Sequence, residues 1–274
     1  MKNKLLVITG PTASGKTAEA IRLAREFGAE ILSCDSRQFY REMRIGVARP
    51  TDEELAAAPH YFVACRSVTE PYNIFDYEHD ALSLLDNLFH HNDVAIAVGG
   101  SGLYVDALRL GVTAMPDPTP DLRARLQQMP IEEKRAQLQM LDPDYYARVD
   151  LRNPVRLQRA LEVCYMTGRP YSQVVAEQEP APRPFDIEVR VVTVPDLRDR
   201  IDRRVDQMMA DGLLDEVESL LPYRHLSTLR TVGYRELFPV LDGTKKLADA
   251  VAEIKLNTWH YARKQLTWCR RYKS

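Results

Sequence analysis

The chain has 274 residues, of which 45% are hydrophobic and 28% are charged, and its formal net charge is −2. This length and composition predict an ordinary globular protein with an adequate core, and they exclude a disordered chain, a collagen-like chain and a disulfide scaffold. The slight negative charge argues weakly against a nucleic-acid partner, because phosphate contacts need Lys and Arg.

The first ten residues, MKNKLLVITG, hold too short an apolar run for a signal-peptide core, and no other stretch approaches the roughly 18 apolar residues of a membrane span. We therefore expect a cytoplasmic protein without membrane contact. The cysteines are far apart and form no C-x-x-C pair, which favours neither a zinc site nor a disulfide framework. We expect all of them to be small core residues: Cys34, Cys65, Cys164 and Cys269.

Residues 5–9 form a continuous apolar run, which predicts a strand buried on both faces of a parallel sheet. Residues 16–27 predict a helix that ends at Gly28. Its apolar face is expected to hold Ala20, Ile21, Ala24 and Phe27. Two more strands are predicted at residues 30–33 and 94–98, each followed by a loop of Gly, Asp or Ser. These elements predict an α/β fold, a P-loop NTPase-like parallel sheet flanked by helices, with the site at the carboxyl edge of the strands.

The character of the sequence changes between residues 111 and 184. Prolines mark both ends of this stretch: Pro116, Pro118 and Pro120, then Pro180, Pro182 and Pro184. Helical patterns rich in Arg and Gln lie between them. We therefore expect a helical insertion at residues 111–184 in a core formed by residues 1–110 and 185–274.

The last part of the chain returns to the core with a predicted strand at residues 187–194 and helices at 197–221 and 247–271. The last two dozen residues of the chain are locally basic, with a single acid, Glu253. Its cations are Lys255, Arg263, Lys264, Arg270, Arg271 and Lys273. These residues form either a solvated helix face or a set of phosphate contacts, and the sequence alone leaves both open.

Residues 10–17, Gly10-Pro11-Thr12-Ala13-Ser14-Gly15-Lys16-Thr17, fit the pattern G-x-x-x-x-G-K-[ST] and are called the phosphate loop below. The match lies between a predicted strand and a predicted helix, which is the context that such a loop requires. Backbone N–H groups would face a phosphate, Lys16 would add a full charge, and the Thr17 hydroxyl would hold Mg²⁺. The loop does not specify the chemistry, since kinases and other diphosphate users share it.

Six short motifs follow one another along nearly the whole chain: GPTASGKT, DSRQFY at 35–40, GVARP at 46–50, GGSGLY at 99–104, RTVGYRE at 230–236 and ARKQLTW at 262–268. Together they resemble the bacterial tRNA dimethylallyltransferases. Two positions depart from the family's usual pattern: Ser101 replaces a threonine and Arg49 replaces a lysine. Both changes keep the hydroxyl or the charge, so we expect function to be intact.

The resemblance implies transfer of a dimethylallyl group from dimethylallyl diphosphate to N6 of adenosine 37 in tRNA, beside the anticodon, with release of pyrophosphate. The phosphate loop, Lys16, a Thr17-bound Mg²⁺ and Arg230 would stabilise the leaving pyrophosphate. Asp35 would orient N6 and accept its proton. Without the resemblance, a magnesium ligand or a helix cap would be the alternative role of Asp35.

The target base must leave the anticodon stack to reach such a site. The resemblance assigns contacts with the tRNA anticodon stem-loop to Asp35, Ser36, Arg37, Gln38, Ser101, Arg123, Val155, Arg156, Leu157, Gln158 and Arg159. Arg156 and Arg159 are three residues apart, so a helix would place both on one face. The alternatives are a surface ion pair for Arg37 and salt bridges to Glu162 or Asp150 for the other two arginines.

Three other functions remain open on the sequence. They are a small-molecule kinase using ATP at the same loop, an isopentenyltransferase acting on free AMP, and a non-catalytic RNA-binding or assembly ATPase. The DSRQ and GGSGLY motifs disfavour the kinase, the insertion and the basic tail favour a polymeric acceptor, and Asp35 disfavours the non-catalytic protein. No feature demands an oligomer, so we expect a monomer.

Overall fold

The structure is a computed structural model that describes residues 2–112, 115, 117–177 and 182–272. Pro116, Pro180 and Lys273, which the sequence singled out, lie outside these residues. The chain forms two compact units. The core unit comprises Met1–Leu110 and Arg183–Ser274, and the insertion unit comprises Gly111–Pro182. No helix among the described residues combines the length and the apolar character that a membrane span needs.

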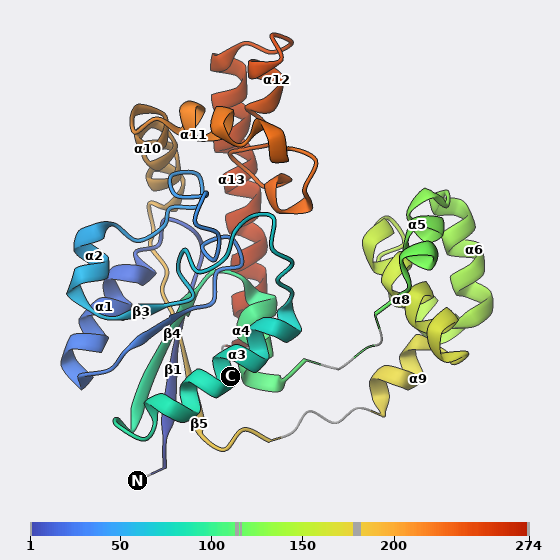
Figure 1. The fold of residues 1–274 in the computed structure, drawn as a ribbon, viewed down its shortest axis with the longest axis horizontal. Helices are drawn as coiled ribbons and strands as arrows, with labels where there is room; N and C mark the ends of the chain where they lie inside the picture. Colours follow the sequence, from blue (N-terminus) through green and yellow to red (C-terminus); the bar gives the residue numbers. More distant parts are fainter. Residues whose placement is uncertain (1, 113–114, 116, 178–181, 273–274) are drawn as a thin grey trace. The chain divides into compact units, whose positions relative to one another are not determined.

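Five parallel strands form one sheet in the core unit, in the order β3-β2-β4-β1-β5 (Figure 1). They are β1 (Lys4–Thr9), β2 (Ile31–Ser33), β3 (His60–Tyr61), β4 (Val94–Gly99) and β5 (Asp186–Val191). The predicted strand at 187–194 ends early, because its pairing with β1 stops where β1 enters the phosphate loop. β3 has only two residues and was not predicted.

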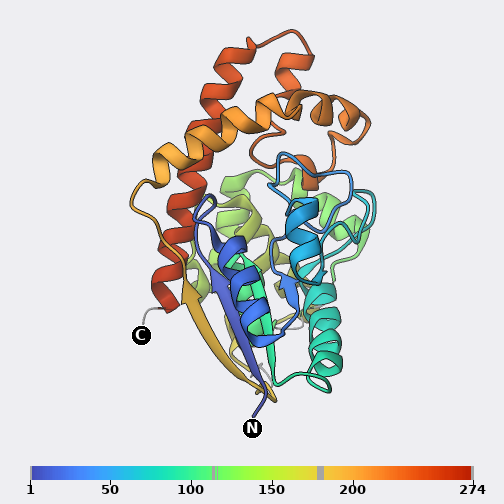
Figure 2. The same cartoon turned by 90° about the vertical axis from the view of Figure 1, so that its left-hand side faces the viewer.

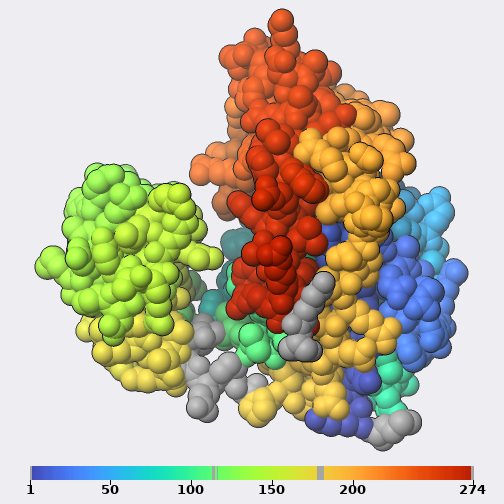
Figure 3. Space-filling view, turned by 180° about the vertical axis from the view of Figure 1, so that it is seen from behind, coloured from blue at the N-terminus to red at the C-terminus, as the bar shows by residue number. Residues whose placement is uncertain are grey.

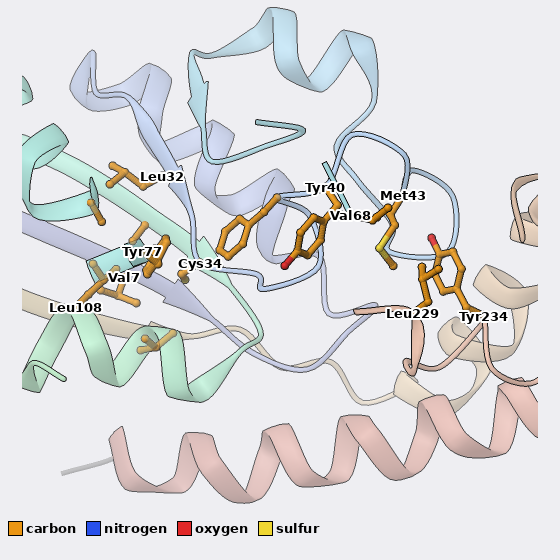
Figure 4. Close-up of a cluster of buried hydrophobic side chains, with 14 of the residues drawn as sticks. Val7, Leu32, Cys34, Tyr40, Met43, Val68, Tyr77, Leu108, Leu229 and Tyr234 are labelled. Carbon is orange, nitrogen blue, oxygen red and sulfur yellow. The ribbon is translucent and has the colours of Figure 1, made fainter. Parts of the chain in front are cut away.

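Alternate residues of the strands face two separate hydrophobic clusters. One face packs against α1 (Lys16–Phe27), and the other packs against α3 (Ile74–Leu88) and α4 (Gly102–Leu110) (Figure 2). The second cluster extends from the sheet at Val7 and Leu32 past Tyr40 to Leu229 and Tyr234 (Figure 4). A parallel sheet covered by helices confirms the predicted α/β class.

The helix α1 has the predicted bounds and ends at Gly28, whose φ of 61° is left-handed. Its buried face holds Ala20, Ile21, Leu23 and Ala24. The predicted burial of Phe27 is wrong, because this side chain is 40% exposed in the last turn and Leu23 packs in the core instead. The burial predicted for Cys65 is also wrong: it is exposed, whereas the other three cysteines are buried.

The helix predicted at 197–221 is two helices, α10 (Leu197–Ala210) and α11 (Leu213–Ser219). Gly212 separates them with a φ of 96°, a backbone conformation that cannot continue a right-handed helix. The shorter α2 (Asp52–Ala57) and α12 (Phe238–Leu241) lie elsewhere in the core unit. The final helix, α13 (Leu247–Cys269), packs alongside α10 (Figure 3) and continues into a 3₁₀ turn at Arg270–Tyr272.

The insertion unit is helical, as expected, with α5 (Pro120–Gln128), α6 (Ile131–Leu141), α7 (Pro143–Tyr146), α8 (Pro154–Thr167) and α9 (Tyr171–Ala176). Its core is formed by buried residues that include Leu126, Leu138 and Leu157. Asp142 is fully buried and accepts hydrogen bonds from the backbone N–H groups of Tyr145 and Ser172 at 2.9 and 2.6 Å. The unit therefore has its own core and its own buried polar anchor.

Candidate functional site

A cavity of about 900 Å³ lies in the core unit at the carboxyl edge of the sheet. Its walls come from the phosphate loop, from residues 35–38 after β2, from residues 44–51, and from the helices α10 and α13. Apolar side chains that include Val47, Val98 and Ile254 line it together with charged ones. The cavity can therefore enclose a ligand with both a charged group and a hydrocarbon group.

The phosphate loop has the backbone that anion binding requires. Gly15 precedes α1 with a left-handed φ of 87° and offers no side-chain cap to the helix N-terminus. The first N–H groups of α1 are therefore left for a ligand. Lys16 contacts the carbonyl oxygen of Pro11 at 3.4 Å, and both Lys16 and Thr17 line the cavity. Burial lowers the pKa of Lys16, Asp35 raises it, and Arg204 lowers it.

Two arginines of α10 bring further positive charge to this loop. Arg200 donates from Nε to the carbonyl oxygen of Ala13 at 2.7 Å, and Arg204 donates from Nη1 to the hydroxyl of Thr12 at 3.3 Å. Arg204 also lines the cavity. Burial lowers the pKa of Arg204, and the like charge of Arg200 lowers it further. Lys16, Arg200 and Arg204 thus place like charges around one loop. An anion with several negative charges, bound there, would relieve their mutual repulsion.

Asp35 lies in the same cavity wall, directly after β2. Its Oδ1 accepts the backbone N–H of Arg37 at 3.1 Å, and its own N–H donates to the hydroxyl of Ser33 at 3.3 Å. These bonds fix the loop that carries the carboxylate. Asp35 and Lys16 interact electrostatically, so the predicted proximity of the carboxylate to the phosphate loop is present in the structure.

The serines of the DSRQFY and GGSGLY motifs meet beside Asp35. The N–H of Ser36 donates to Oγ of Ser101 at 3.2 Å, and the two hydroxyl oxygens are 3.3 Å apart. The bond to the Ser36 N–H needs only a hydroxyl at position 101, which serine has in common with threonine. Tyr261 of α13 lines the cavity nearby. Tyr261 is 41% exposed as a whole, but partial desolvation in the cavity wall and the Asp35 carboxylate raise its pKa to about 12, which keeps its hydroxyl protonated as a donor at neutral pH.

Arg37 and Gln38 both line the cavity, but Gln38 is held by the protein at both ends of its amide. Its Oε1 accepts from the Ser33 hydroxyl at 3.1 Å, and its Nε2 donates to the carbonyl oxygen of Ala48 at 3.0 Å. Gln38 therefore has a fixed orientation in the wall before any ligand binds.

Arg230 is not among the residues of the cavity wall, although its neighbour Thr231 is. The Arg230 side chain is exposed at the end of a 3₁₀ turn. Glu236 of the same motif pairs with Arg235 at 2.7 Å, and no ion pair of Arg230 occurs among the described residues. Arg204, unlike Arg230, lines the cavity beside the phosphate loop.

The helix α13 ties two motif loops together. Gln265 accepts the backbone N–H of Thr12 at 2.8 Å and donates to the carbonyl oxygen of Gly100 at 2.9 Å. A Cβ atom added at Gly102 would lie 2.4 Å from the Trp268 ring, so this glycine allows α4 to approach α13 closely. The terminal ARKQLTW motif is thus a support for the phosphate loop and the GGSGLY loop.

The residues predicted in the insertion lie on α5 and α8. Val155 and Arg156 are exposed on α8, whereas Arg159 and Gln158 both contact Glu162, at 3.3 and 3.0 Å. Arg123 pairs with Asp117 at 3.6 Å. The assignment of Leu157 to RNA contact is corrected, because its side chain is fully buried in the insertion core.

The basic C-terminal residues differ in their surroundings. Lys255 pairs with Asp206 at 2.6 Å and Arg271 with Asp106 at 3.4 Å. Over the part of the chain that the structure describes, no ion pair forms at the exposed residues Arg263, Lys264 and Arg270. Within the described part of the tail, these three are therefore available to a partner.

A magnesium ion fits the phosphate loop only with help from the substrate. The hydroxyl of Thr17 and the carboxylate of Asp35 line the cavity, and no cluster of three or more His, Cys, Asp or Glu able to hold a metal occurs within the described ranges. Mg²⁺ commonly takes few protein ligands and completes its shell with phosphate oxygens and water. The residues present match that mode.

Arg200, Arg204 and Tyr261 were not predicted as site residues. Their sequence signal is weak: two arginines four residues apart in an arginine-rich helix, and a tyrosine among polar residues. The Arg204–Thr12 contact joins residues 192 positions apart, which no local pattern reveals.

Comparison with known proteins gives consistent matches over almost the whole chain. The family model described as IPP transferase matches residues 38–272. The tRNA dimethylallyltransferase 1 of Bacteroides thetaiotaomicron is 46% identical over 274 residues, which cover 97% of this chain and 88% of that protein. The tRNA dimethylallyltransferase of Christiangramia forsetii is 44% identical over 276 residues, 99% of this chain and 91% of that protein.

Solved structures agree with these matches. The full-length tRNA isopentenylpyrophosphate transferase from Bacillus halodurans has a TM-score of 0.70 and 33% identity, covering 98% of this chain and 87% of that one. A eukaryotic dimethylallyltransferase described as acting on tRNA has a TM-score of 0.84 and 25% identity, covering 97% of this chain and 70% of that one.

Proposed function

Because the chain belongs to the IPP transferase family, that of the tRNA dimethylallyltransferases, we propose that it transfers a dimethylallyl group from dimethylallyl diphosphate to N6 of adenosine 37 in tRNA. The observation that carries the proposal is the presence of Lys16, Arg204 and Asp35 in the wall of one cavity. It brings charge for a diphosphate leaving group and a carboxylate for an amine nucleophile into the same space.

The positive charges around the phosphate loop would serve the leaving group. When the bond between C1 and oxygen breaks, its electron pair stays on the pyrophosphate, where negative charge accumulates. The N–H groups of the phosphate loop, Lys16 and Arg204 would stabilise that charge from the cavity wall, and Arg200 holds the loop through Ala13. Magnesium held by Thr17 and the diphosphate oxygens would supply additional charge neutralisation. The apolar part of the wall, including Val47 and Ile254, would hold the dimethylallyl chain.

Asp35 and its neighbours in the cavity wall would serve the acceptor amine. Formation of the bond between N6 and C1 makes the nitrogen positive, and one N6 proton must then leave. Asp35 would orient N6 and take that proton. Tyr261, protonated at neutral pH, and the hydroxyl of Ser36 can donate to ring nitrogens of the extruded adenine. Arg37 would contact the neighbouring phosphate or base.

The tRNA itself would be held by residues outside the cavity. The exposed cations Arg156, Arg263 and Lys264 can neutralise phosphates, which positions the RNA without reading its sequence. We propose a monomer, because no feature of the sequence demands an oligomer, and we propose that it works in the cytoplasm, where tRNA is modified.

A competition between acceptors tests the proposal. The protein is incubated with labelled dimethylallyl diphosphate, Mg²⁺, an anticodon stem-loop RNA and an equal concentration of AMP. We expect the label to enter the RNA. Label in AMP would favour the AMP transferase, and ATP hydrolysis without any transfer of label would favour the kinase or ATPase alternatives.

A further inference from the structure

Glu216 of α11 collects hydrogen bonds from a loop at the rim of the cavity. Its Oε2 accepts the backbone N–H groups of Arg44 at 3.0 Å and Ile45 at 2.7 Å, and its Oε1 accepts that of Gly46 at 3.1 Å. Oε1 also accepts the hydroxyl of Tyr234 at 2.6 Å. Consecutive N–H groups that surround an anion form a backbone nest. Here the anion is a side chain of the protein itself.

Tyr234 closes the other side of this arrangement. Its ring is fully buried, and a Cβ atom added at Gly46 would lie 2.5 Å from it. Burial and the Glu216 carboxylate raise the pKa of Tyr234, so its hydroxyl stays a donor. Figure 4 shows Tyr234 with Leu229 at the end of the core cluster, close to Met43. The RTVGYRE and GVARP motifs therefore meet at one carboxylate.

The loop that Glu216 holds, residues 44–50, is called the rim loop. All of its residues line the cavity, whereas Glu216 does not. The carbonyl oxygens of Val47 and Ala48 accept the Gln38 amide at 3.5 and 3.0 Å. Ala48 has a left-handed φ of 48°, a conformation that costs a residue with a side chain about 1 kcal/mol or more and persists only when its surroundings hold it.

We propose that Glu216 is a positioning residue for dimethylallyl transfer. It fixes the rim loop through Arg44, Ile45 and Gly46, and the rim loop in turn fixes the amide of Gln38, three residues from Asp35. Glu216 touches neither substrate. The inference rests on the proposed function, because it assigns Glu216 to that same site.

The experiment uses Glu216→Gln, which replaces one acceptor oxygen with an NH₂ group facing backbone donors. Steady-state kinetics are measured with the RNA and with dimethylallyl diphosphate, together with hydrogen exchange of the backbone. Misplacement of a substrate-lining segment by about 1 Å can cost roughly 100-fold in rate, so we expect kcat to fall about 10- to 100-fold. The KM for dimethylallyl diphosphate should change less than kcat, because the phosphate loop, which holds the diphosphate, is untouched and only the Val47 part of the apolar wall belongs to the rim loop.

In Glu216→Gln, hydrogen exchange of the backbone should accelerate in residues 44–50 and remain unchanged in α1. Tyr234→Phe removes one of the four hydrogen bonds and keeps the ring, so it should give a smaller effect in the same direction. Glu218→Gln is the matched control, since Glu218 is exposed on the same helix. It should leave kinetics and exchange unchanged.

Two outcomes overturn the inference while leaving the proposed function intact. In the first, the wild type is active, and Glu216→Gln has the same kcat and the same hydrogen exchange in the rim loop as the wild type. In the second, Glu216→Gln and Tyr234→Phe both lose activity, and hydrogen exchange rises throughout the protein, including α1. That pattern would indicate a general defect of the fold. A wild type that transfers no dimethylallyl group overturns the proposed function and this inference with it, whatever the exchange shows.

Discussion

Arg204 and Arg230 differ in how they relate to the cavity. Arg204 contacts Thr12 and lines the wall, whereas Arg230 is exposed and outside it. Loss of one preorganised donor to developing negative charge costs about 10²–10³ in kcat. We therefore predict that Arg204→Ala lowers kcat/KM for dimethylallyl diphosphate by about that factor, and that Arg230→Ala has a much smaller effect. Arg203→Ala, an exposed change on the same helix, is the control.

The comparison is made by initial rates at varied donor concentration with saturating RNA. An Arg230→Ala enzyme more impaired than Arg204→Ala would return Arg230 to the diphosphate site and contradict the geometry described above.

His60 lies in the cavity wall, where its Nδ1 is 2.7 Å from the carbonyl oxygen of Ala58 and its Nε2 has no partner among the described residues. Burial lowers the pKa of His60, so the unfolded chain takes up the proton before the folded one does. This imidazole therefore destabilises the fold as pH falls below its unfolded pKa of about 6.5.

We predict that His60→Asn flattens the pH dependence of the free energy of unfolding between about pH 7.5 and about pH 5.5, where the unfolded imidazole titrates. Urea titrations across this range measure it. An equally steep dependence in the variant would show that other groups, and not His60, set the loss of stability in acid.

At the scale of elements, α13 connects the phosphate loop to the GGSGLY loop through Gln265. In Gln265→Glu the second carboxylate oxygen would face the Gly100 carbonyl oxygen in a site where the side chain is 6% exposed. An unsatisfied buried acceptor costs about 1–3 kcal/mol, and we predict a loss of stability of this order. Gln127→Glu, an exposed change of the same chemistry, should be neutral. Thermal unfolding that is identical for the two variants would contradict the role of Gln265.

The sequence predicts elements well where their signal is local. The phosphate loop, α1 and the strands β1, β2 and β4 follow from apolar runs and glycines within a few residues. The break at Gly212 was missed although its glycine is visible, because the apolar pattern continues on both sides of it. Leu157 was assigned to RNA from a resemblance, whereas its helical spacing with Ala160 and Leu161 indicates a core position. The contacts of Gln265, Arg204 and Glu216 depend on tertiary packing, which spacing alone does not contain.

At the scale of the whole molecule, binding of RNA should follow the exposed cations. Reversal of Arg263, Lys264 or Arg156 to Glu should weaken binding of the anticodon stem-loop and reduce the slope of log K against log salt by about one unit for each lost phosphate contact. Titrations from low to high salt measure these slopes. Arg22→Glu on α1 is the control, and slopes that match the wild type in every variant would leave these cations as ordinary solvated residues.

The central claim is that Asp35 and the phosphate loop carry out dimethylallyl transfer to a tRNA adenosine. It is tested most directly by mass spectrometry of the nucleosides of unmodified tRNA after incubation with the protein, Mg²⁺ and dimethylallyl diphosphate, with Asp35→Ala in parallel. We predict one dimethylallylated adenosine, at position 37, with a rate about 10²-fold or more lower in Asp35→Ala, as expected for loss of a general base. Unmodified tRNA with the wild-type protein, or equal rates for the two proteins, would contradict the account.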